Sequence, residues 1–525
     1  MFITFLPVYK QIQVESGTNL LQAARENGIH LGGVCSGQGY CGKCKVLVTK
    51  GNLKNFGREE LTYLTQEERA NGIRLACCFC VTQDTCVIIQ GESDSKGTED
   101  NSSLTPSEPV SQSSRLVDPY GIVFDIGTTT VVGELWNLAK KEKSIQCSKH
   151  NPQSLFGADV ISRITYANSS IDNRNRLTGL IRTCCNDIIS ELTTSVGLRR
   201  FDVTTMVICG NTTMSHLFLG KSVDSLMRVP FQGISYNKEV WKAGDLHLDI
   251  KSDAEVYIMP GISGHVGSDT LGCILSTKLA STKGTLLMVD IGTNGELVLA
   301  KDGKLMTCST AAGPAFEGAS LHQGMRADDG AISKVIINQD KIELDYIGSD
   351  KPGVFPRGIC GSGLIEAVSE LLTNQWIDET GRLLGEAGIK NQVTLWKSAE
   401  SQVILTQKDI RELQLAKGAI YAGIQLMLRE MQITMNEIDK IYLAGAFGSN
   451  VNLKKAISIG LLPDIDVNRI EYIGNGALAG ASMLLLEEVS KMEAEAISRN
   501  ISHLELAQCE EFSEEFMKAL SFPQK

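Results

Sequence analysis

Four cysteines near the start of the chain have the spacing of a ligand set. Cys35, Cys41 and Cys44 form a C-x5-C-x2-C pattern, and Cys77 follows after 32 intervening residues. The plant-type [2Fe–2S] spacing is C-x4-C-x2-C…C, so this chain has one extra residue in the first interval. Four thiolates must converge on two irons, with three from one tight loop and a fourth from a distant segment. The pattern therefore predicts that Cys35, Cys41 and Cys44, together with a fourth cysteine from the segment around Cys77, bind a [2Fe–2S] cluster.

These cysteines have three alternative explanations: buried core thiols, a zinc site and a disulfide framework. Zinc sites favour paired C-x2-C motifs, and this region has one such pair behind a glycine-rich loop. Disulfide frameworks belong to secreted chains, and the N-terminus lacks the basic segment of a signal peptide. Cys78 and Cys80 crowd beside Cys77, so the residues alone leave the fourth ligand open among the three.

Two aspartates stand at the ends of apolar strands, in segments that echo each other at 121–135 and 286–300. Asp125 and Asp290 each precede Ile-Gly-Thr and a second apolar strand. Such a strand–turn–strand presents backbone N–H and hydroxyl groups to phosphates. Two carboxylates facing each other across a cleft can hold hydrated Mg²⁺ and help position an attacking water. We therefore expect Asp125 and Asp290 to be catalytic and the phosphates to be bound by Gly127, Thr128, Thr129, Thr130, Gly292, Thr293 and Asn294.

A third segment, KIYLAGAFGSN at 440–450, is a strand that enters a turn of small residues. It resembles the adenosine-binding segment of the actin, Hsp70 and sugar-kinase superfamily, whose phosphate loops the two Asp-Ile-Gly-Thr segments also resemble. In that superfamily the glycines let the backbone lie against the base and ribose. The resemblance implies that ATP contacts Gly445, Ala446, Phe447 and Gly448.

Several further residues are candidates with an equally good structural explanation. His265 and Asp269 precede the second phosphate loop and could support the catalytic water, or could simply end and cap a helix. Thr212 and Thr213 follow a strand in a region that leads into the cleft of the superfamily. Cys360 stands at the start of a predicted helix, but no base partner is evident for a nucleophilic role.

The elements that must position these residues divide the chain into three parts. Residues 1–91 alternate apolar and polar positions and predict one small α+β unit. Residues 92–118 have no aromatic residue and many Ser, Glu, Asp and Pro, which predicts a flexible linker. As a coil of 27 residues it would average roughly 30 Å end to end. Residues 119–525 predict a large α/β domain, and the two similar segments suggest that it has two similar halves.

Composition narrows the function classes. The net charge is −11, from 50 basic and 61 acidic residues, which gives no electrostatic reason to bind nucleic acid or an anionic membrane surface. No run of 18 apolar residues occurs, so a membrane span is not expected. With no signal peptide expected, we interpret the protein as cytoplasmic.

Taken together, nearly the whole chain resembles the ATP-dependent reductive activators of corrinoid proteins. The resemblance rests on the cysteine loop, the Ser/Glu-rich linker, both Asp-Ile-Gly-Thr loops, GNTTMSH, GHVGSD and LAGAFG. It implies an α/β multidomain fold: a β-grasp ferredoxin domain, then a duplicated actin/Hsp70-like (ribonuclease H-like) ATPase domain of the ASKHA type. In that family the fourth ligand follows Arg-Leu-Ala, which selects Cys77. Some members carry a small domain after the linker, and here Tyr120 passes almost directly into the first phosphate loop.

The resemblance also implies a reaction and its partners. The protein would use ATP and Mg²⁺ to reduce an inactive Co(II) corrinoid protein of a methyltransferase system to Co(I). Electrons would pass through the cluster from a low-potential donor such as a ferredoxin or flavodoxin. The linker would let the ferredoxin shuttle, and a homodimer is conceivable. Three rivals stay open: a dehydratase-activator-like electron-transfer ATPase, a redox-sensing regulator or chaperone, and a small-molecule kinase.

Overall fold

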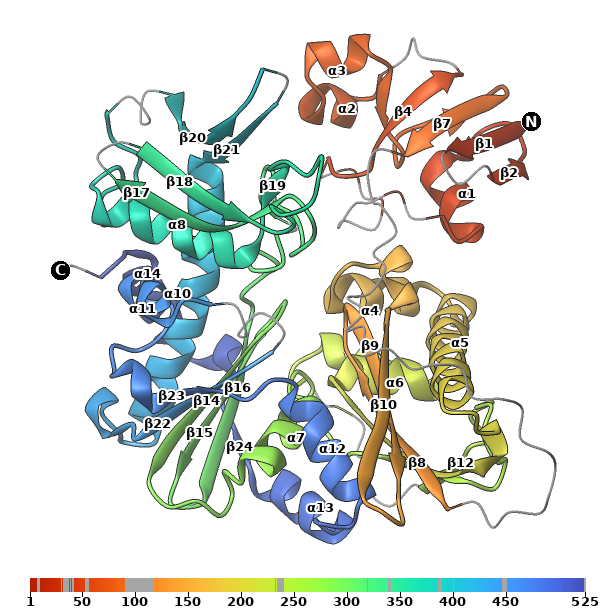
Figure 1. Cartoon of the computed structure of the whole chain (residues 1–525), viewed down its shortest axis with the longest axis vertical. Helices are drawn as coiled ribbons and strands as arrows, with labels where there is room; N and C mark the ends of the chain where they lie inside the picture. The colour runs from red at the N-terminus through yellow and green to blue at the C-terminus, as the bar shows by residue number, and fades with distance from the viewer. Residues whose placement is uncertain are drawn as a thin grey trace.

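The computed structural model describes the chain except for residues 7–9, 30, 32–36, 38, 40–41, 52–55, 90–117, 232, 234–239, 319, 339–340, 386–389, 400, 446–450 and 524–525. Within the described part, no helix is both long enough and apolar enough to cross a membrane. Figure 1 shows a small N-terminal unit beside a larger body of two halves.

The N-terminal unit is built on a five-stranded sheet of order β2-β1-β7-β4-β5. The apolar–polar alternation of its strands places one face against a core of buried aliphatic side chains and Phe5. The expected strands and helices form, including the helix opened by a Thr65–Glu68 capping box. The elements are β1 (Phe2–Leu6), β2 (Lys10–Gln13), β3 (Thr18–Asn19), α1 (Leu20–Glu26), β4 (Lys45–Lys50), α2 (Arg58–Tyr63), α3 (Gln66–Ala70), β5 (Ile73–Leu75), β6 (Cys80–Val81) and β7 (Thr85–Ile89).

The first half of the larger body has a six-stranded sheet of order β10-β9-β8-β11-β13-β12. Its central strands are mostly apolar and mostly buried, because helices and the other half cover the sheet. The elements are β8 (Tyr120–Ile126), β9 (Thr130–Asn137), β10 (Glu142–His150), α4 (Val160–Ser169), α5 (Ile171–Ser195), β11 (Val203–Gly210), α6 (Thr212–Leu219), β12 (Val240–Lys242) and β13 (Glu255–Ile258).

The second half repeats this plan with a sheet of order β23-β22-β14-β15-β16-β24, to which it adds a smaller sheet and a hairpin. In both halves an antiparallel hairpin, β8–β9 or β14–β15, carries the Asp-Ile-Gly-Thr segment, which confirms the predicted duplication of this device. The elements are β14 (Thr285–Ile291), β15 (Gly295–Lys301), β16 (Lys304–Thr310), β17 (Ala331–Asn338), β18 (Lys341–Tyr346), β19 (Gly358–Ile359), α8 (Gly361–Thr373), β20 (Gln392–Lys397), β21 (Gln402–Thr406), α10 (Gln407–Glu430), β22 (Lys440–Ala444), α11 (Leu453–Ser458), β23 (Ile470–Tyr472), α13 (Lys491–Asn500), β24 (Ser502–His503) and α14 (Phe512–Leu520).

Two helices, α7 (Ser268–Thr277) and α12 (Gly476–Leu485), lie between the halves (Figure 1). They touch backbone to backbone: a Cβ on Gly480 would stand 2.1 Å from the Gly272 carbonyl oxygen, and one on Gly272 would stand 2.5 Å from the Ala477 carbonyl oxygen. Any larger residue would force the helices apart. The glycines therefore fix how closely the two halves approach.

A buried ion pair supports the segment that leads to Cys77. Arg74 donates from Nε and Nη2 to the two carboxylate oxygens of Glu60, at 2.8 and 2.7 Å. Its guanidinium lies over the rings of Phe56 and Phe79, and Glu60 also accepts from the Leu75 N–H. This bidentate, aromatic-flanked geometry favours arginine specifically.

We predict that Glu60→Gln lowers the free energy of unfolding of the N-terminal unit by about 3–5 kcal/mol, because it leaves a buried guanidinium without its counter-charge. Guanidinium titration of the full chain, followed by cluster absorbance, measures the loss. Glu68→Gln is the matched control, since the Glu68–Lys45 pair is about one-third exposed, and it should cost about 0–1 kcal/mol. Equal midpoints for the two variants would contradict the prediction.

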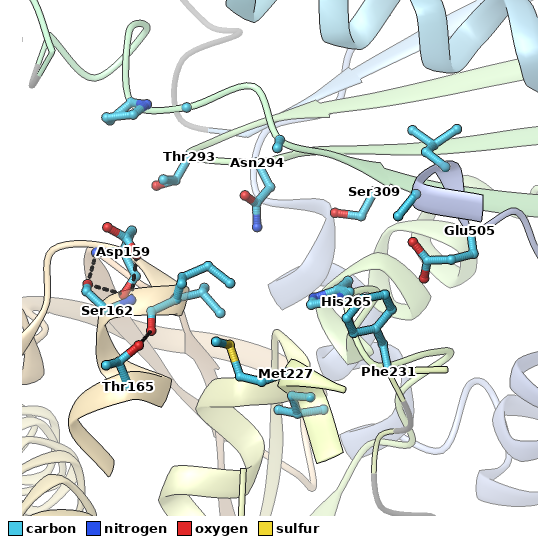
Figure 2. Close-up of a pocket in the computed structure, with 18 of the residues that line it drawn as sticks. Asp159, Ser162, Thr165, Met227, Phe231, His265, Thr293, Asn294, Ser309 and Glu505 are labelled. Carbon is cyan, nitrogen blue, oxygen red and sulfur yellow. Dashed lines mark hydrogen bonds between the residues drawn. The ribbon is translucent and has the colours of Figure 1, made fainter. Parts of the chain in front are cut away.

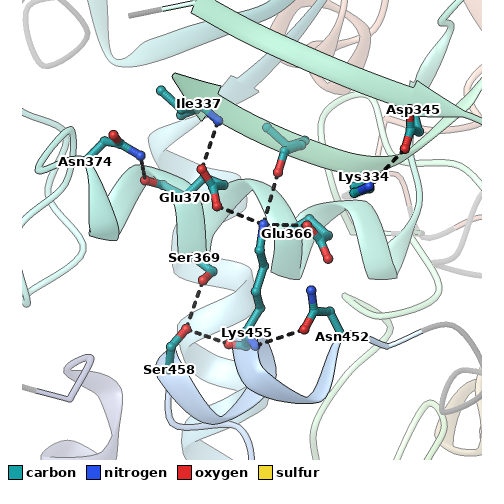
Figure 3. Close-up of polar contacts among 11 residues, drawn as sticks. Lys334, Ile337, Asp345, Glu366, Ser369, Glu370, Asn374, Asn452, Lys455 and Ser458 are labelled. Atoms are coloured by element: carbon teal, nitrogen blue, oxygen red, sulfur yellow. Dashed lines mark hydrogen bonds and ion pairs between the residues drawn. The ribbon is translucent and has the colours of Figure 1, made fainter. Parts of the chain in front are cut away.

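A second buried ionic cluster holds α11, the helix that follows the 445–450 segment. Figure 3 shows Lys455 reaching to α8, where its Nζ lies 2.6 Å from a Glu366 carboxylate oxygen and 2.9 Å from one of Glu370. It also donates to the Val335 carbonyl at 3.1 Å. The three charged side chains are 7–17% exposed, so water screens them little.

Lys455→Met should therefore destabilise the second half by about 3–5 kcal/mol, because two carboxylates lose their shared cation. Lys334→Met is the control, because its partner Asp345 lies in an exposed pair (Figure 3), and it should cost at most about 1 kcal/mol. Differential scanning calorimetry measures both variants. The prediction fails if Lys455→Met unfolds at the same temperature as the control.

Candidate functional site

Side chains of the first half hold the first phosphate loop by donating hydrogen bonds to its backbone carbonyls. Asn151 donates its Nδ2 to the Gly127 carbonyl at 2.8 Å, and Arg163 donates its Nη2 to the Thr128 carbonyl at 2.5 Å. The Asn151 N–H donates to the Thr129 carbonyl at 2.8 Å. In a trans peptide the next N–H points opposite to the carbonyl. Holding the carbonyls from behind therefore directs N–H groups of the loop towards the cleft, where phosphates could accept them.

The second phosphate loop forms an equally tight turn, in which the Gly292 N–H donates to the Asn294 carbonyl at 2.9 Å. The Thr293 hydroxyl donates to a Glu317 carboxylate oxygen at 2.6 Å. Gly445, at the end of β22, packs on this loop, and a Cβ there would stand 2.6 Å from Asp290 Oδ1. The other predicted adenosine contacts, Ala446, Phe447 and Gly448, lie outside the described residues.

Four carboxylates converge between the two hairpins. Burial in the cleft raises the pKa of Asp125 to about 7, with a further rise from Asp269, against an opposing hydrogen bond from Asn475. Burial, Asp269 and Asp125 raise the pKa of Asp290 to about 7. Burial raises the pKa of Asp269 to about 6, and burial with the neighbouring aspartates raises that of Glu296 well above its usual value. Such mutual shifts indicate a site that lacks positive charge.

This set fits Mg²⁺, which prefers oxygen ligands and keeps several of its waters. In the described part of the chain, no three His, Cys, Asp or Glu side chains lie close enough to bind one ion directly. The carboxylates would therefore hold the ion largely through water and phosphate oxygens. A bound Mg²⁺ would supply charge neutralisation for the phosphates, while Asp125 stays oriented by the 2.8 Å bond from Asn475 Nδ2.

Residues of the second loop line a large pocket between the halves. The pocket holds about 1090 Å³, with Thr293 and Asn294 on one wall and α4 on the other (Figure 2). His265 lies in it together with His503 and Glu505, and its ring centroid is 4.9 Å from that of Phe231, with the two rings tilted by 55°. Burial lowers the pKa of both histidines, so both are neutral at pH 7. The pocket therefore offers neutral acceptors and donors beside the phosphate loops.

The remaining sequence candidates have structural roles. Thr212 and Thr213 are buried in the first turn of α6, where Thr212 donates to the Ser263 carbonyl at 2.7 Å. Their neighbour Asn211 reaches the loop, donating from Nδ2 to the Thr128 hydroxyl at 2.9 Å. Cys360 is buried at the start of α8, with its thiol directed to the Ile332 carbonyl.

Sequence reasoning missed Arg163, Glu296, Glu317 and Asn475. None of these four residues lies within either Asp-Ile-Gly-Thr motif. Glu296 comes nearest, because it stands six residues after Asp290, on the strand that follows the turn. A search for polar residues on the inward face of that hairpin would have found Glu296. Asn475 caps the start of α12, a helix rich in small residues, and no local pattern in the sequence marks it as part of the cleft.

In the cysteine site, Cys44 and Cys77 are described, whereas Cys35 and Cys41 lie outside the described residues. The Cys44 and Cys77 sulfurs are 3.3 Å apart, and Cys78 Sγ lies 3.6 Å from Cys77 Sγ. The hydrogen bond to Cys77 lowers the pKa of Cys44 to about 7, while the same bond raises that of Cys77. The residues fit a cluster, because two sulfurs from distant segments already meet and one thiolate forms readily.

The carboxylate pKa values predict a pH effect. Asp125 and Asp290 hold protons up to about pH 7 in the folded state but only to about pH 4 when unfolded. The folded state therefore binds more protons in this window, and stability of the metal-free protein should fall as pH rises from 4 to 7. Mg²⁺ binds the deprotonated groups, so its affinity should rise with pH. Calorimetry with and without Mg²⁺ measures both trends; a flat profile for both contradicts the site.

Family models match three successive parts of the chain. Residues 3–82 match the 2Fe-2S iron-sulfur cluster binding domain, residues 120–282 the RACo middle region, and residues 284–525 the C-terminal domain of RACo, the ASKHA domain. The boundary between the last two matches falls just before the second phosphate hairpin.

Similarity to known relatives extends over most of the length of both proteins in each comparison. The chain is 37% identical over 422 residues to the corrinoid activation enzyme RamQ of Eubacterium limosum, which covers 77% of this chain and 70% of RamQ. It is 26% identical over 444 residues to the Co(II) methylated amine-specific corrinoid protein reductase of Methanosarcina barkeri, covering 77% of each. A solved reductive activator for a corrinoid, iron-sulfur protein superposes with a TM-score of 0.69 at 30% identity, covering 100% of this chain and 98% of that one. The chain thus pairs a [2Fe–2S]-binding domain with an ASKHA-type domain, and it belongs to the family of ATP-dependent reductive activators of corrinoid proteins.

Proposed function

We propose that this protein uses ATP to drive the one-electron reduction of a Co(II) corrinoid protein, part of a methyltransferase system, to Co(I). The observation that carries the proposal is the joining, in one chain of this family, of a two-loop cleft rich in carboxylates to a cluster-binding unit. A low-potential ferredoxin or flavodoxin would supply the electron, the cluster would pass it on, and the cobalt would accept it.

The division of labour follows from the residues. Residues 1–91 would form the ferredoxin domain, 92–118 the linker and 119–525 the ATPase domain. Gly127, Thr128, Thr129 and Thr130 would bind phosphates from one side, and Gly292, Thr293 and Asn294 from the other. Asp125 and Asp290 would position hydrated Mg²⁺ and the attacking water, with Asp269 and Glu296 adding charge. We propose that ATP binds here together with Mg²⁺. Its adenosine would contact Gly445, Ala446, Phe447 and Gly448.

ATP is needed because the transfer is uphill. Plant-type clusters have potentials of about −400 mV, and Co(I) requires a lower potential than such a cluster readily supplies. Binding energy can do this work only if the protein has different affinities for two partner states. We propose that the nucleotide-dependent movement of the two halves changes the affinity for the Co(II) partner and the cobalt ligation. We also propose a cytoplasmic location, in keeping with cysteines that serve as ligands, and assembly as a homodimer.

The test is anaerobic. Reduced protein is mixed with a panel of Co(II) corrinoid proteins, and the cobalt spectrum is followed with MgATP, with Mg²⁺ and a non-hydrolysable ATP analogue, and without nucleotide. We expect Co(I) to form with one partner and MgATP only. ATP hydrolysis with no Co(I) from any partner would refute the corrinoid proposal. Transfer of the phosphoryl group to a small molecule would favour a kinase instead.

A further inference from the structure

One loop touches the nucleotide cleft, both halves and the ferredoxin domain. It comprises residues 311–326, between β16 and β17, and we call it the strap. Its first residues, including Gly313 and Pro314, line the pocket beside the second phosphate loop. At its far end, Arg326 Nη2 lies 2.8 Å from His150 Nε2, at the end of β10 in the first half. The strap therefore spans the cleft.

The strap contacts the second phosphate loop directly. The Thr293 hydroxyl, on the second phosphate loop, donates to a Glu317 carboxylate oxygen at 2.6 Å. Burial lowers the pKa of Arg163 to about 9, and the negative charges of Asp159 and Glu317 oppose this shift, so the Glu317 charge lies near the support of the first loop. A hydroxyl has one proton to donate, so Thr293 cannot donate to a phosphate and to Glu317 together. A phosphate there would also repel the Glu317 carboxylate.

The strap also holds the cysteine loop of the ferredoxin domain. Lys43 lies between the ligand positions Cys41 and Cys44, and its Nζ donates to the Leu321 carbonyl at 2.6 Å. Leu321 stands four residues after Glu317. Figure 1 shows the N-terminal unit next to the β19 and β21 end of the second half, to which this part of the strap is attached.

The strap is anchored by hydrogen bonds at His322 and Gln323, whereas a buried hydroxyl in its middle has no partner among the described residues. The His322 N–H donates to Asp409 at 2.6 Å, and the Gln323 side chain bonds to β21 at 2.7 and 3.0 Å. Between Glu317 and these anchors, the Ser320 hydroxyl is buried and has no hydrogen-bond partner among the described residues. An unsatisfied buried hydroxyl destabilises this arrangement relative to one in which the Ser320 hydroxyl finds a partner.

We infer that the strap is a nucleotide-controlled docking site for the cysteine loop of the ferredoxin domain. Without nucleotide, Thr293 holds Glu317 and the strap presents the Leu321 carbonyl to Lys43. Phosphate at the second loop takes the Thr293 hydroxyl, displaces Glu317 and weakens the docking. Docking at Lys43, which stands between the ligand positions Cys41 and Cys44, keeps this part of the ferredoxin domain from a protein partner. ATP thereby releases the ferredoxin for electron delivery. The inference rests on the proposed function only in taking the ligand to be ATP.

The test uses the full-length protein with its cluster, carrying the photo-crosslinking residue p-benzoylphenylalanine at the exposed His322 position. Anaerobic illumination without nucleotide should crosslink the peptide that spans residues 42–50. Adding Mg²⁺ and a non-hydrolysable ATP analogue should lower the yield by at least about five-fold, the lower end of ordinary coupling. The same crosslinker at Met492, which is 80% exposed on α13, is the control and should not capture that peptide.

A second measurement follows from reciprocity. If nucleotide weakens docking, then weakening docking must tighten nucleotide binding by the same factor. Lys43→Ala should therefore raise the affinity for the ATP analogue, measured calorimetrically, by at most the factor by which nucleotide weakens docking. No capture without nucleotide, or equal capture with nucleotide bound, overturns the inference. If no nucleotide binds at all, the ATP proposal fails, while capture in the nucleotide-free protein still decides whether the strap docks the cysteine loop.

Discussion

Asp290→Asn will lower ATP hydrolysis by about 10–100-fold, the usual loss when a group that orients the shell of a metal ion is removed. The physical reason is charge. Asp290 is one of four carboxylates in the cleft, and its raised pKa of about 7 records how strongly the site needs a cation. Asparagine keeps the size of the side chain but removes one negative charge. ATP-driven Co(I) formation should fall at least as far, because it depends on hydrolysis.

The experiment compares phosphate release at several Mg²⁺ concentrations, so that weaker metal binding separates from slower hydrolysis. Asp345→Asn is the control, since Asp345 lies in an exposed pair on β18 and should leave the rate unchanged. Asp125→Asn should resemble Asp290→Asn, although it also disturbs the Asn475 contact. An Asp290→Asn protein that hydrolyses ATP at the wild-type rate would remove this aspartate from the catalytic site.

Cys77→Ser will abolish the cluster, whereas the neighbouring Cys78→Ser will keep it. Cys77 lies 3.3 Å from the Cys44 sulfur, and its carbonyl is fixed by Asn19 Nδ2 at 2.8 Å, so its position is held on both sides. Visible absorbance and the electron paramagnetic resonance signal of the reduced protein report the cluster. Co(I) formation should drop to background in Cys77→Ser, while ATP hydrolysis remains measurable.

The two substitutions form a matched pair, because the residues are adjacent and both half-buried. A cluster retained in Cys77→Ser and lost in Cys78→Ser would make Cys78 the fourth ligand. Cys44→Ser should behave as Cys77→Ser does. If all three variants keep a normal cluster, the ligand set read from the spacing is wrong.

Much of the fold could be predicted from local patterns. The two Asp-Ile-Gly-Thr hairpins, the capped helix at Thr65 and the duplicated plan each depend on a few adjacent residues. Asn475 could not be found this way, because it meets Asp125 from 350 residues away. Glu317 sits in a loop with no motif, and only the fold brings it to Thr293.

The C-terminal residues from 487 onwards show the same limit. Their many charged residues are typical of a solvated tail, yet β24 adds to the second sheet beside β16, and α14 packs on α10. Lys417 of α10, buried, donates to the Ala519 carbonyl at 2.6 Å and so fastens this end. From the sequence alone, a short amphipathic helix with a charged face looks like a solvated segment, because the element that its apolar face packs on is not known.

The glycine contact between α7 and α12 limits what ATP can do mechanically. Because the helices touch backbone to backbone at Gly272 and Gly480, the halves cannot move closer there, and sliding is opposed by the interlocked turns. The remaining freedom is rotation about the crossing, which acts as a fulcrum. Displacement then grows with distance from it, and Figure 1 places β19 and β21 at the end of the second half remote from α7 and α12. We therefore expect a small rotation of the second half at the phosphates to give its largest displacement at the end that lies beside the N-terminal unit.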